Sequence, residues 1–350
     1  MHRPVIAVAA ALVFFTRFFA EAQEDAPQKA PPSTVYFAQD YDAMDQLEEK
    51  PGVTRRMVDQ VVMAATHETD IVRAWRSLVS PNDKVGIKIA ATGGHYFATH
   101  HGVVDAIAAG LQAAGVSRVI VWDRDADDLA AAGFVSRRGF YEVRSTPTGI
   151  GYDRKAPFSA PILGKLIWGD TVFQEKQRKI GKASFEADQL SSISYFSNIL
   201  TQDVTKIINV PVFSDSPGCG VGGAVYNLTV PNLDNWRRFV QPDGAPSLPD
   251  IYADDHIRPK VVINIMDALL AQYAGGPRFN PNYSFALNRI YASKDPVALD
   301  ANVFRLIQKW RVEARLPSIA KEAEWLSDAE EMGLGNFAEP KITLQQVSAR

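Results

Sequence analysis

Cysteine is almost absent from the 350-residue sequence, in which Cys219 is the single example. One cysteine cannot form a disulfide within the chain. It also cannot supply the ligands of a zinc ribbon or of a cysteine-bound iron–sulfur cluster. A lone thiol suits an oxidising compartment, because no second thiol in the chain can mispair with it. We therefore expect neither a disulfide framework nor an intrachain iron–sulfur cluster.

A large excess of charge of either sign is also missing. The chain has 37 Lys and Arg against 40 Asp and Glu, a formal net charge of -3. This balance argues against nucleic acid as a partner, because nucleic-acid binding needs a broad basic surface. The mean hydropathy of -0.12 excludes a polytopic membrane protein. The P-loop, H-E-x-x-H and G-x-S-x-G motifs do not occur in the sequence.

The N-terminus has the layout of a secretory signal peptide. An apolar run at 5–15 is followed by an A-x-A cleavage sequence at 20–22. The run is shorter than the ~20 residues of a transmembrane helix, so we expect no membrane span after cleavage. We expect residues 1–22 to be removed and the protein to be periplasmic or secreted. The alternative is an uncleaved amphipathic anchor.

The rest of the chain indicates one α/β domain. Residues 23–50 read as a polar, Pro-rich linker and N-terminal segment, and the domain is expected over 51–350. Alternating strands and helices predict a largely parallel sheet with helices on both faces. An irregular inserted subdomain, without a clean period, is expected off that sheet at about 136–184. The parallel strands are predicted at 84–90, 119–122, 207–212 and 261–266.

Local patterns predict further elements. Apolar periodicity indicates helices, and a short apolar run indicates one more strand. The stretch 224–236, AVYNLTVPNLDNW, looks β-like. The helices are expected at 53–79, 189–200, 297–310 and 319–332, and the strand at 288–292.

Polar side chains gather at the predicted strand ends, and ligands of open parallel sheets bind outside the carboxyl ends of the strands. Carboxylates suit a divalent metal. Lysine and arginine suit an anionic group. The predicted metal ligands are Asp123, Asp267 and Asp295. The predicted ligand-binding residues are Lys88, His95, Asp123, Arg124, Asn209, Ser214, Gly220, Gly222, Gly223 and Asn227.

Several of these residues also have an ordinary structural explanation. Asp295 precedes a proline, which is typical of a helix N-cap. Asp123 and Asp267 can likewise cap the segments that follow them. The three histidines between 95 and 101 can be surface loop residues.

Lys88 is harder to explain as an ordinary structural residue. It lies between two isoleucines in a strand predicted to be buried on both faces. A buried lysine is costly without a partner. We therefore expect a carboxylate within hydrogen-bond reach, either Asp123 or Asp267, and one shared pocket for Lys88, Asp123, Asn209 and Asp267.

The glycine-rich loop at 218–223 formally satisfies G-x-G-x-x-G after a strand. That motif indicates dinucleotide binding only where a helix follows and an acid lies about 20 residues further on. Here the β-like stretch stops at Pro231, and Asp234 comes too early. We therefore expect no NAD site. A backbone nest that accepts an anion is the remaining interpretation of the loop.

Several strings, in a fixed order over about 83–335, resemble the bacterial and archaeal domain-of-unknown-function family 362. They include DKVGIKIAATGG, THHGVVDAIAAGLQAAGVSRVIVWDRDADDLAAAGF, KIINVPVF, INIMDALLAQYAGGP, YASKDPVALDA and AEEMGLG. The resemblance implies an α/β fold. Some members of the family carry ferredoxin-type cluster domains, and this chain has none.

The chain departs from the family pattern at particular positions. Family members often carry Lys and His where this chain has Ser214 and Ser216. They often have Lys-Asn at Tyr226-Asn227, and Asn at Ala90. If those family residues bind a cofactor or substrate, this protein binds a different one or none.

The sequence thus predicts an exported protein with a polar crevice that binds a metal ion or a small anionic ligand. Three roles fit such a crevice. The first is an enzyme. The second is a non-catalytic periplasmic binding or redox-accessory protein, and the third is an interaction protein whose crevice is vestigial. The cofactor this sequence suggests is a divalent metal, the expected partner is a small molecule, and the oligomeric state is left open.

Overall fold

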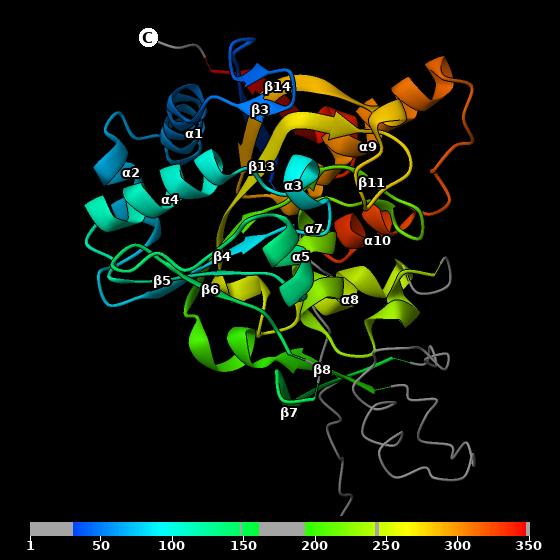
Figure 1. Ribbon diagram of the computed structural model, residues 1–350. Helices are drawn as coiled ribbons and strands as arrows, with labels where there is room; N and C mark the ends of the chain where they lie inside the picture. Colours follow the sequence, from blue (N-terminus) through cyan, green and yellow to red (C-terminus); the bar gives the residue numbers. More distant parts are fainter. Residues whose placement is uncertain (1–30, 148, 161–192, 242–244, 348–350) are drawn as a thin grey trace, which may run out of the picture.

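The computed structural model describes residues 31–147, 149–160, 193–241 and 245–347 (Figure 1). Its main feature is a nine-stranded sheet in the order β15-β1-β14-β13-β9-β4-β5-β6, with β10 also paired to β13. The strands are β1 Ser33–Gln39, β4 Lys84–Ile89, β5 Arg118–Trp122, β6 Glu142–Arg144, β9 Lys206–Val210, β10 Val212–Phe213, β13 Val261–Gln272, β14 Ser284–Ser293 and β15 Ile342–Gln346.

Most neighbouring strands of this sheet run parallel. The pairs from β13 through β9, β4 and β5 to β6 are all parallel, and so is the pair of β1 and β15. β14 is the exception, because it runs antiparallel to both β1 and β13. The four predicted parallel strands lie in the parallel part of the sheet, which confirms the predicted fold class. The strand predicted at 288–292 exists, but it is antiparallel to its neighbours.

Helices cover both faces of the sheet, as Figure 1 shows. Each layer packs over its own cluster of buried apolar side chains. Such double coverage is usual for parallel strands. One layer contains α1 Pro51–Thr66, α2 Ile71–Leu78 and α4 His101–Ala113. The other contains α7 Ala224–Thr229, α8 Leu248–Ala253, α9 Pro296–Glu313 and α10 Trp325–Glu331.

The side chains of β4 point alternately toward the two helical layers. Val85, Ile87 and Ile89 belong to the apolar cluster under α1 and α4. The intervening Gly86 and Lys88 therefore face the α7 layer. A side chain at Gly86 would meet the Trp122 ring at 2.5 Å, so glycine makes room there for the tryptophan.

Part of the segment predicted as a linker belongs to the domain. β1 lies between β14 and β15 in the central sheet, and Tyr36 stands opposite Ala292. Four of its seven residues are buried. The domain therefore includes residue 33 and does not begin at 51. The Pro-rich composition just before β1 hid the strand in the sequence pattern.

The predicted insertion at 136–184 lies only partly off the sheet. β6 belongs to this segment and pairs with β5, which corrects that part of the prediction. Three residues are too few to give a recognisable period. β7 Tyr152–Ser159 does lie off the main sheet, because it pairs with β8 Ile193–Ser197 in a separate two-stranded sheet. Residues 161–184 are outside the described part of the chain.

Four local predictions also need correction. The helix predicted at 53–79 divides into α1 and α2, because His67 takes a left-handed conformation and Asp70 caps a new helix. Within the helix predicted at 189–200, the described residues form β8 and the start of a π-helix. The β-like stretch after the glycine-rich loop begins with helix α7. The helix predicted at 319–332 is confined to α10.

Among the described residues, no helix is both long and apolar enough to cross a membrane.

Candidate functional site

A cavity of about 90 Å³ lies beyond the carboxyl ends of β4 and β5 and beside β10. Its walls come from segments far apart in the chain, as expected at the carboxyl edge of a parallel sheet. Five predicted ligand-binding residues line it: Asp123, Arg124, Ser214, Gly222 and Asn227. Four positions at which the chain departs from the family pattern also line it: Ala90, Ser214, Ser216 and Tyr226. We name this cavity the crevice.

Lys88 lies under the crevice, fully buried, and has the predicted carboxylate partner. Its ammonium donates to Asp123 Oδ1 at 2.8 Å, to Ile89 O at 2.6 Å and to Asn227 Oδ1 at 3.1 Å. These three bonds use all of its donors. Burial lowers the pKa of Lys88, and the charge of Asp123 offsets part of that effect. The prediction of a buried Lys88–Asp123 pair is confirmed.

The Asp123 carboxylate also accepts hydrogen bonds from two backbone amides. Oδ1 also accepts from the amide of Arg124 at 2.8 Å, and Oδ2 accepts from the amide of Ala91 at 2.7 Å. The carboxylate therefore anchors the ends of both β4 and β5. Its function within the described structure is to neutralise the lysine and to fix the crevice wall.

A row of buried polar residues continues from Lys88 across the sheet. The register places Lys88 opposite Asn209, Asn209 opposite Asn264, and Asn264 opposite Ser293. Asn227 donates to Asn209 Oδ1 at 2.8 Å, and Asn209 donates to Asn264 Oδ1 at 2.9 Å. All five side chains are buried. Asn209 therefore belongs to the support of the crevice rather than to its lining.

Three polar groups of the crevice point to a ligand. The Arg124 guanidinium lies 3.9 Å from the centre of the Trp236 ring, a cation–π contact. Within the described residues, no acidic side chain pairs with it. The hydroxyls of Tyr226 and Ser214 likewise have no hydrogen bond within the part of the chain that the structure describes. Burial raises the pKa of Tyr226, so its hydroxyl keeps its proton and can act as a donor.

The other carboxylates around the crevice already have partners. Asp125 caps α5 Ala126–Ala131 by accepting from the amides of Asp127 and Asp128. Asp128 lies 4.0 Å from Arg278, and burial together with the charge of Asp125 raises its pKa. Asp215, the fourth acidic residue of the lining, accepts from the Gly276 amide at 2.9 Å, and burial raises its pKa.

The amides that directly follow the glycine-rich loop bind a carboxyl group of the chain itself. The buried Asp300 carboxylate accepts from the amides of Ala224 at 2.5 Å and Val225 at 2.9 Å, at the start of α7. A Cβ at Gly223 would lie 2.0 Å from Asp300 Oδ1, so glycine is needed for this approach. Burial raises the pKa of Asp300 to about 7. Gly223 and Gly220, which packs against Ala323, are therefore structural.

Asp267 lies on the other face of the sheet, where it pairs with His100. The His100 ring approaches Asp267 Oδ2 through Nδ1 at 2.8 Å, and its backbone amide donates to the same oxygen at 2.7 Å. Burial lowers the pKa of His100, but the negative charges of Asp267, Glu49 and Glu48 raise it further, and the net shift is upward. Burial also raises the pKa of the nearby Glu49. Asp267 is thus excluded from the predicted pocket with Lys88.

Asp295 and His95 also lie outside the crevice. Asp295 caps α9 by accepting from the Ala298 amide at 2.8 Å, and it binds the Ser33 hydroxyl at 2.6 Å. It follows β14, whose antiparallel direction places its carboxyl end at the opposite edge of the sheet. The His95 side chain is 63% exposed, and its nearest acid is Glu48 at 3.7 Å.

The predicted metal ligands are therefore not brought together. Asp123 pairs with a lysine, Asp267 with a histidine, and Asp295 caps a helix. Among the described residues, no group of three or more His, Cys, Asp or Glu side chains is placed to hold a metal ion. The prediction of a shared metal site at these three aspartates is wrong.

Some important residues were missed in the sequence. Trp236 is the last residue of the stretch that looks β-like and the first residue of a short 3-10 helix, Trp236–Phe239, and its contact with Arg124 has no signal in the local sequence. Asp300 had a signal, since it is an acid inside the buried run of a predicted helix. His100 was treated as a surface residue because its partner is 167 positions away.

Comparison with known proteins gives one family and one distant structure. A family model described as "Domain of unknown function (DUF362)" matches residues 84–305. A search of curated proteins gave no match. A crystal structure of a Thermotoga maritima protein is similar at 10% identity with a TM-score of 0.38. The similarity covers 70% of this chain and 58% of that protein, so the chain spans less than two thirds of that protein's length.

Proposed function

The chain belongs to the DUF362 family, a domain of unknown function, and from the geometry of its crevice we propose that it binds a small anionic molecule there. One observation carries the proposal. Arg124 has no acidic partner within the described residues, although four aspartates line the same crevice and are all engaged elsewhere. A guanidinium held in this way has its fork of donors available for a carboxylate, phosphate or sulfate.

The neighbouring groups suit the same ligand. The guanidinium carbon of Arg124 lies 3.9 Å from the centre of the Trp236 ring, and the guanidinium N–H groups have no hydrogen-bond partner among the described residues. The hydroxyls of Tyr226 and Ser214 are additional donors on the walls. The small volume of about 90 Å³ favours a compact ligand with one anionic group. The Lys88 ammonium neutralises Asp123, which reduces the repulsion between that carboxylate and the anion.

The same geometry favours binding over catalysis. Lys88 has no donor left for a substrate, and the oxygens of Asp123 are filled by lysine and backbone amides. The raised pKa of Tyr226 makes it a poor proton carrier near neutral pH. We therefore favour a non-catalytic binding role.

The departures from the family pattern support a ligand specific to this chain. Ala90, Ser214, Ser216 and Tyr226 all line the crevice, where the family resemblance implies larger polar or cationic residues. This crevice has fewer cations than the family resemblance implies, and Arg124 is the single cation among its described lining residues. The proposed ligand thus carries less negative charge than one held by several lysines.

Replacing Arg124 with glutamine tests the proposal. We expect at least one of phosphate, sulfate, acetate, succinate or citrate to raise the melting temperature of the wild-type protein. Arg124→Gln should weaken that binding by about 10- to 100-fold, because a hydrogen bond to a charged group contributes roughly 1.5–3 kcal/mol. Thermal shift and calorimetric titration measure both effects.

Arg289→Gln is the matched control. Arg289 also lies over an aromatic ring, at 4.8 Å from the Phe37 ring centre, but far along the sheet on β14. Its replacement should leave anion binding unchanged. Equal losses in the two variants, or no response to any anion, would contradict the proposal. A response to divalent cations alone would favour the metal alternative.

We also propose that the protein is exported to the periplasm or beyond. The support is the apolar run and the A-x-A sequence within residues 1–22, which lie outside the described part of the chain. Intact-mass measurement of the protein produced in a bacterial host should show a chain that starts at Gln23. Ala22→Asp should block cleavage at this position, because the site requires small residues. Full-length wild-type protein in the cytosol would contradict the proposal.

A further inference from the structure

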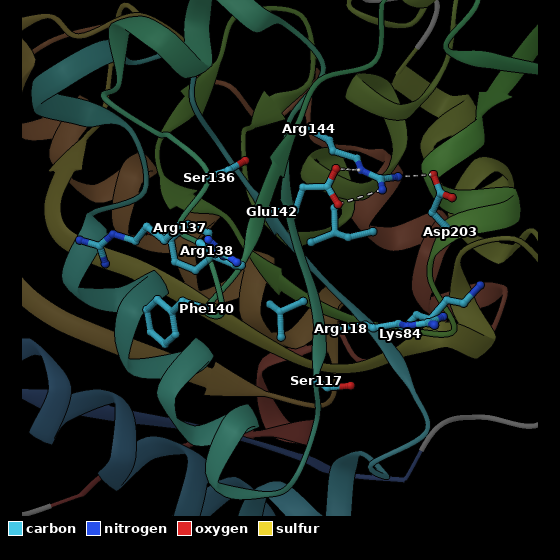
Figure 2. A pocket seen from close by; sticks show the side chains of 14 residues that line it. Lys84, Ser117, Arg118, Ser136, Arg137, Arg138, Phe140, Glu142, Arg144 and Asp203 are labelled. Carbon is cyan, nitrogen blue, oxygen red and sulfur yellow. Dashed lines mark hydrogen bonds and ion pairs between the residues drawn. The ribbon is translucent and has the colours of Figure 1, made fainter.

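A second and larger hollow lies at the other end of β4 and β5, away from the crevice (Figure 2). Its volume is about 510 Å³, within the usual range for small-molecule sites of ~300–1,000 Å³. It is lined by the first residues of β4 and β5, by the segment 136–142, and by Arg144 and Asp203. We name it the basic hollow, because five cations but only two acids line it: Lys84, Arg118, Arg137, Arg138 and Arg144 against Glu142 and Asp203.

Two of the five cations are already neutralised. Arg144 binds both oxygens of Glu142, at 2.7 and 2.9 Å, and Asp203 at 2.9 Å, as the dashed lines in Figure 2 show. Arg137 binds both oxygens of Asp105, at 2.7 and 2.6 Å. Both acids of the lining are therefore paired with Arg144, and Arg137 is paired with Asp105.

The other three cations have no such partner. Within the described residues, the side chains of Lys84, Arg118 and Arg138 make no ion pair and no hydrogen bond. Asp83, the acid beside Lys84 in sequence, is occupied by Ser80 and Thr205. Three positive charges thus face a hollow of a protein whose formal net charge is -3.

Lys84 and Arg118 are held next to each other by the sheet. They stand directly opposite in the parallel register of β4 and β5, and Figure 2 shows both side chains on the same side of the hollow. Thr205 fixes the Lys84 backbone on both sides, through its hydroxyl at 3.0 Å and its amide at 2.9 Å. Like charges at opposed positions of a sheet destabilise it. A multivalent anion between them would remove this repulsion.

We propose that the basic hollow binds an oligophosphate, a chain of two or three linked phosphate groups. Paired cations on adjacent strands match two neighbouring phosphates, and guanidinium forks suit phosphate oxygens. Arg138, from the opposite wall, supplies a third contact that a single phosphate group would not need. The source is either inorganic oligophosphate or the phosphate chain of a nucleotide.

Calorimetric titration of the full-length protein with tripolyphosphate tests the proposal. Wild-type protein should bind tripolyphosphate more tightly than orthophosphate. The double variant Lys84→Gln/Arg118→Gln should weaken tripolyphosphate binding by about tenfold or more, since charge-assisted bonds to phosphate are strong. Arg138→Gln should also weaken tripolyphosphate binding. Because Arg138 lies outside the strands, this result does not depend on the stability of the sheet.

Lys309→Gln/Lys321→Gln is the matched control, because it removes two exposed lysines from a different part of the chain. It should leave tripolyphosphate binding unchanged. Equal losses in both double variants would overturn the proposal in favour of a diffuse charge effect, and so would equal affinity for orthophosphate. Arg124→Gln should not affect this site, which separates it from the crevice. A nucleoside triphosphate that binds more tightly than tripolyphosphate would identify a nucleotide as the source, and equal binding would identify the free chain.

Discussion

Lys88→Met is expected to lower the free energy of unfolding by about 3–5 kcal/mol, the typical cost of removing one partner from a buried ion pair. Methionine fills a similar volume but cannot donate. Asp123 would keep a buried charge with only two backbone donors, and Asn227 Oδ1 and Ile89 O would lose their donor. Urea unfolding followed by circular dichroism at pH 7 measures the loss.

An exposed ion pair supplies the control. Arg137→Met removes a cation that binds Asp105 at 2.6 Å with 48% of its side chain exposed. It should cost no more than about 1 kcal/mol, as surface pairs do. The double variant Lys88→Met/Asp123→Asn should lose less than the two single variants together, because it leaves no unpaired charge. A Lys88→Met protein as stable as the Arg137→Met protein would show that the buried pair has little energetic weight.

Asp267→Asn is the second large effect, and it should depend on pH. The folded state raises the pKa of His100 above the ordinary histidine value of 6.5, because the effect of burial is outweighed by the surrounding negative charges, chiefly that of Asp267. A raised histidine pKa contributes stability that is fully present below pH 6.5 and is lost as pH rises through the folded-state pKa. The asparagine removes the charge that favours the imidazolium. We expect a loss of about 3 kcal/mol at pH 6 and a smaller loss at pH 9.

The pair of Asp254 and His256 allows a matched comparison. Its ring nitrogen lies 2.7 Å from the carboxylate, but the histidine side chain is 38% exposed. Asp254→Asn should change the free energy of unfolding by no more than about 1 kcal/mol at either pH. Unfolding curves of both variants at pH 6 and pH 9 test the prediction. A loss for Asp267→Asn that is the same at both pH values would mean that His100 is neutral throughout.

The sequence was sufficient where local pattern and topology coincide. Lys88 was recognisable as a problem because it interrupts an apolar strand. Its partner followed from the register, since Lys88 stands opposite Trp122 and Asp123 comes next. The crevice at the ends of β4 and β5 was therefore predictable, together with Arg124.

Two aspartates were misplaced because strand direction and strand length are not local properties. Ligands bind beyond the carboxyl ends of parallel strands. Because β14 runs antiparallel to β13, Asp295 follows β14 at the opposite end of the strands from the crevice. β13 continues to Gln272, so Asp267 lies within the strand and not at its end. Period-two alternation then turns it toward the same face as Ile265 and Leu269.

Helix α7 shows a different kind of limit. Its residues include the β-branched Val225 and Thr229, which favour strands in a local reading, and Pro231 comes two residues after its end. The first two amides of the helix donate to Asp300, which lies 76 positions from Ala224. A helix stabilised by so distant a carboxylate cannot be recognised from its own sequence.

The buried polar row from Lys88 to Ser293 has a consequence for how the chain selects its topology. A slip of one residue in β4, β9 or β13 would turn a lysine or an asparagine toward the opposite helical layer, which is built from apolar side chains. Apolar contacts between strands tolerate such slips much better, because one branched side chain replaces another. The side chains of Lys88, Asn209, Asn264 and Ser293 therefore favour a single register of β4, β9, β13 and β14. The polar row buries less apolar surface than apolar side chains would, but it makes one strand register more stable than the others.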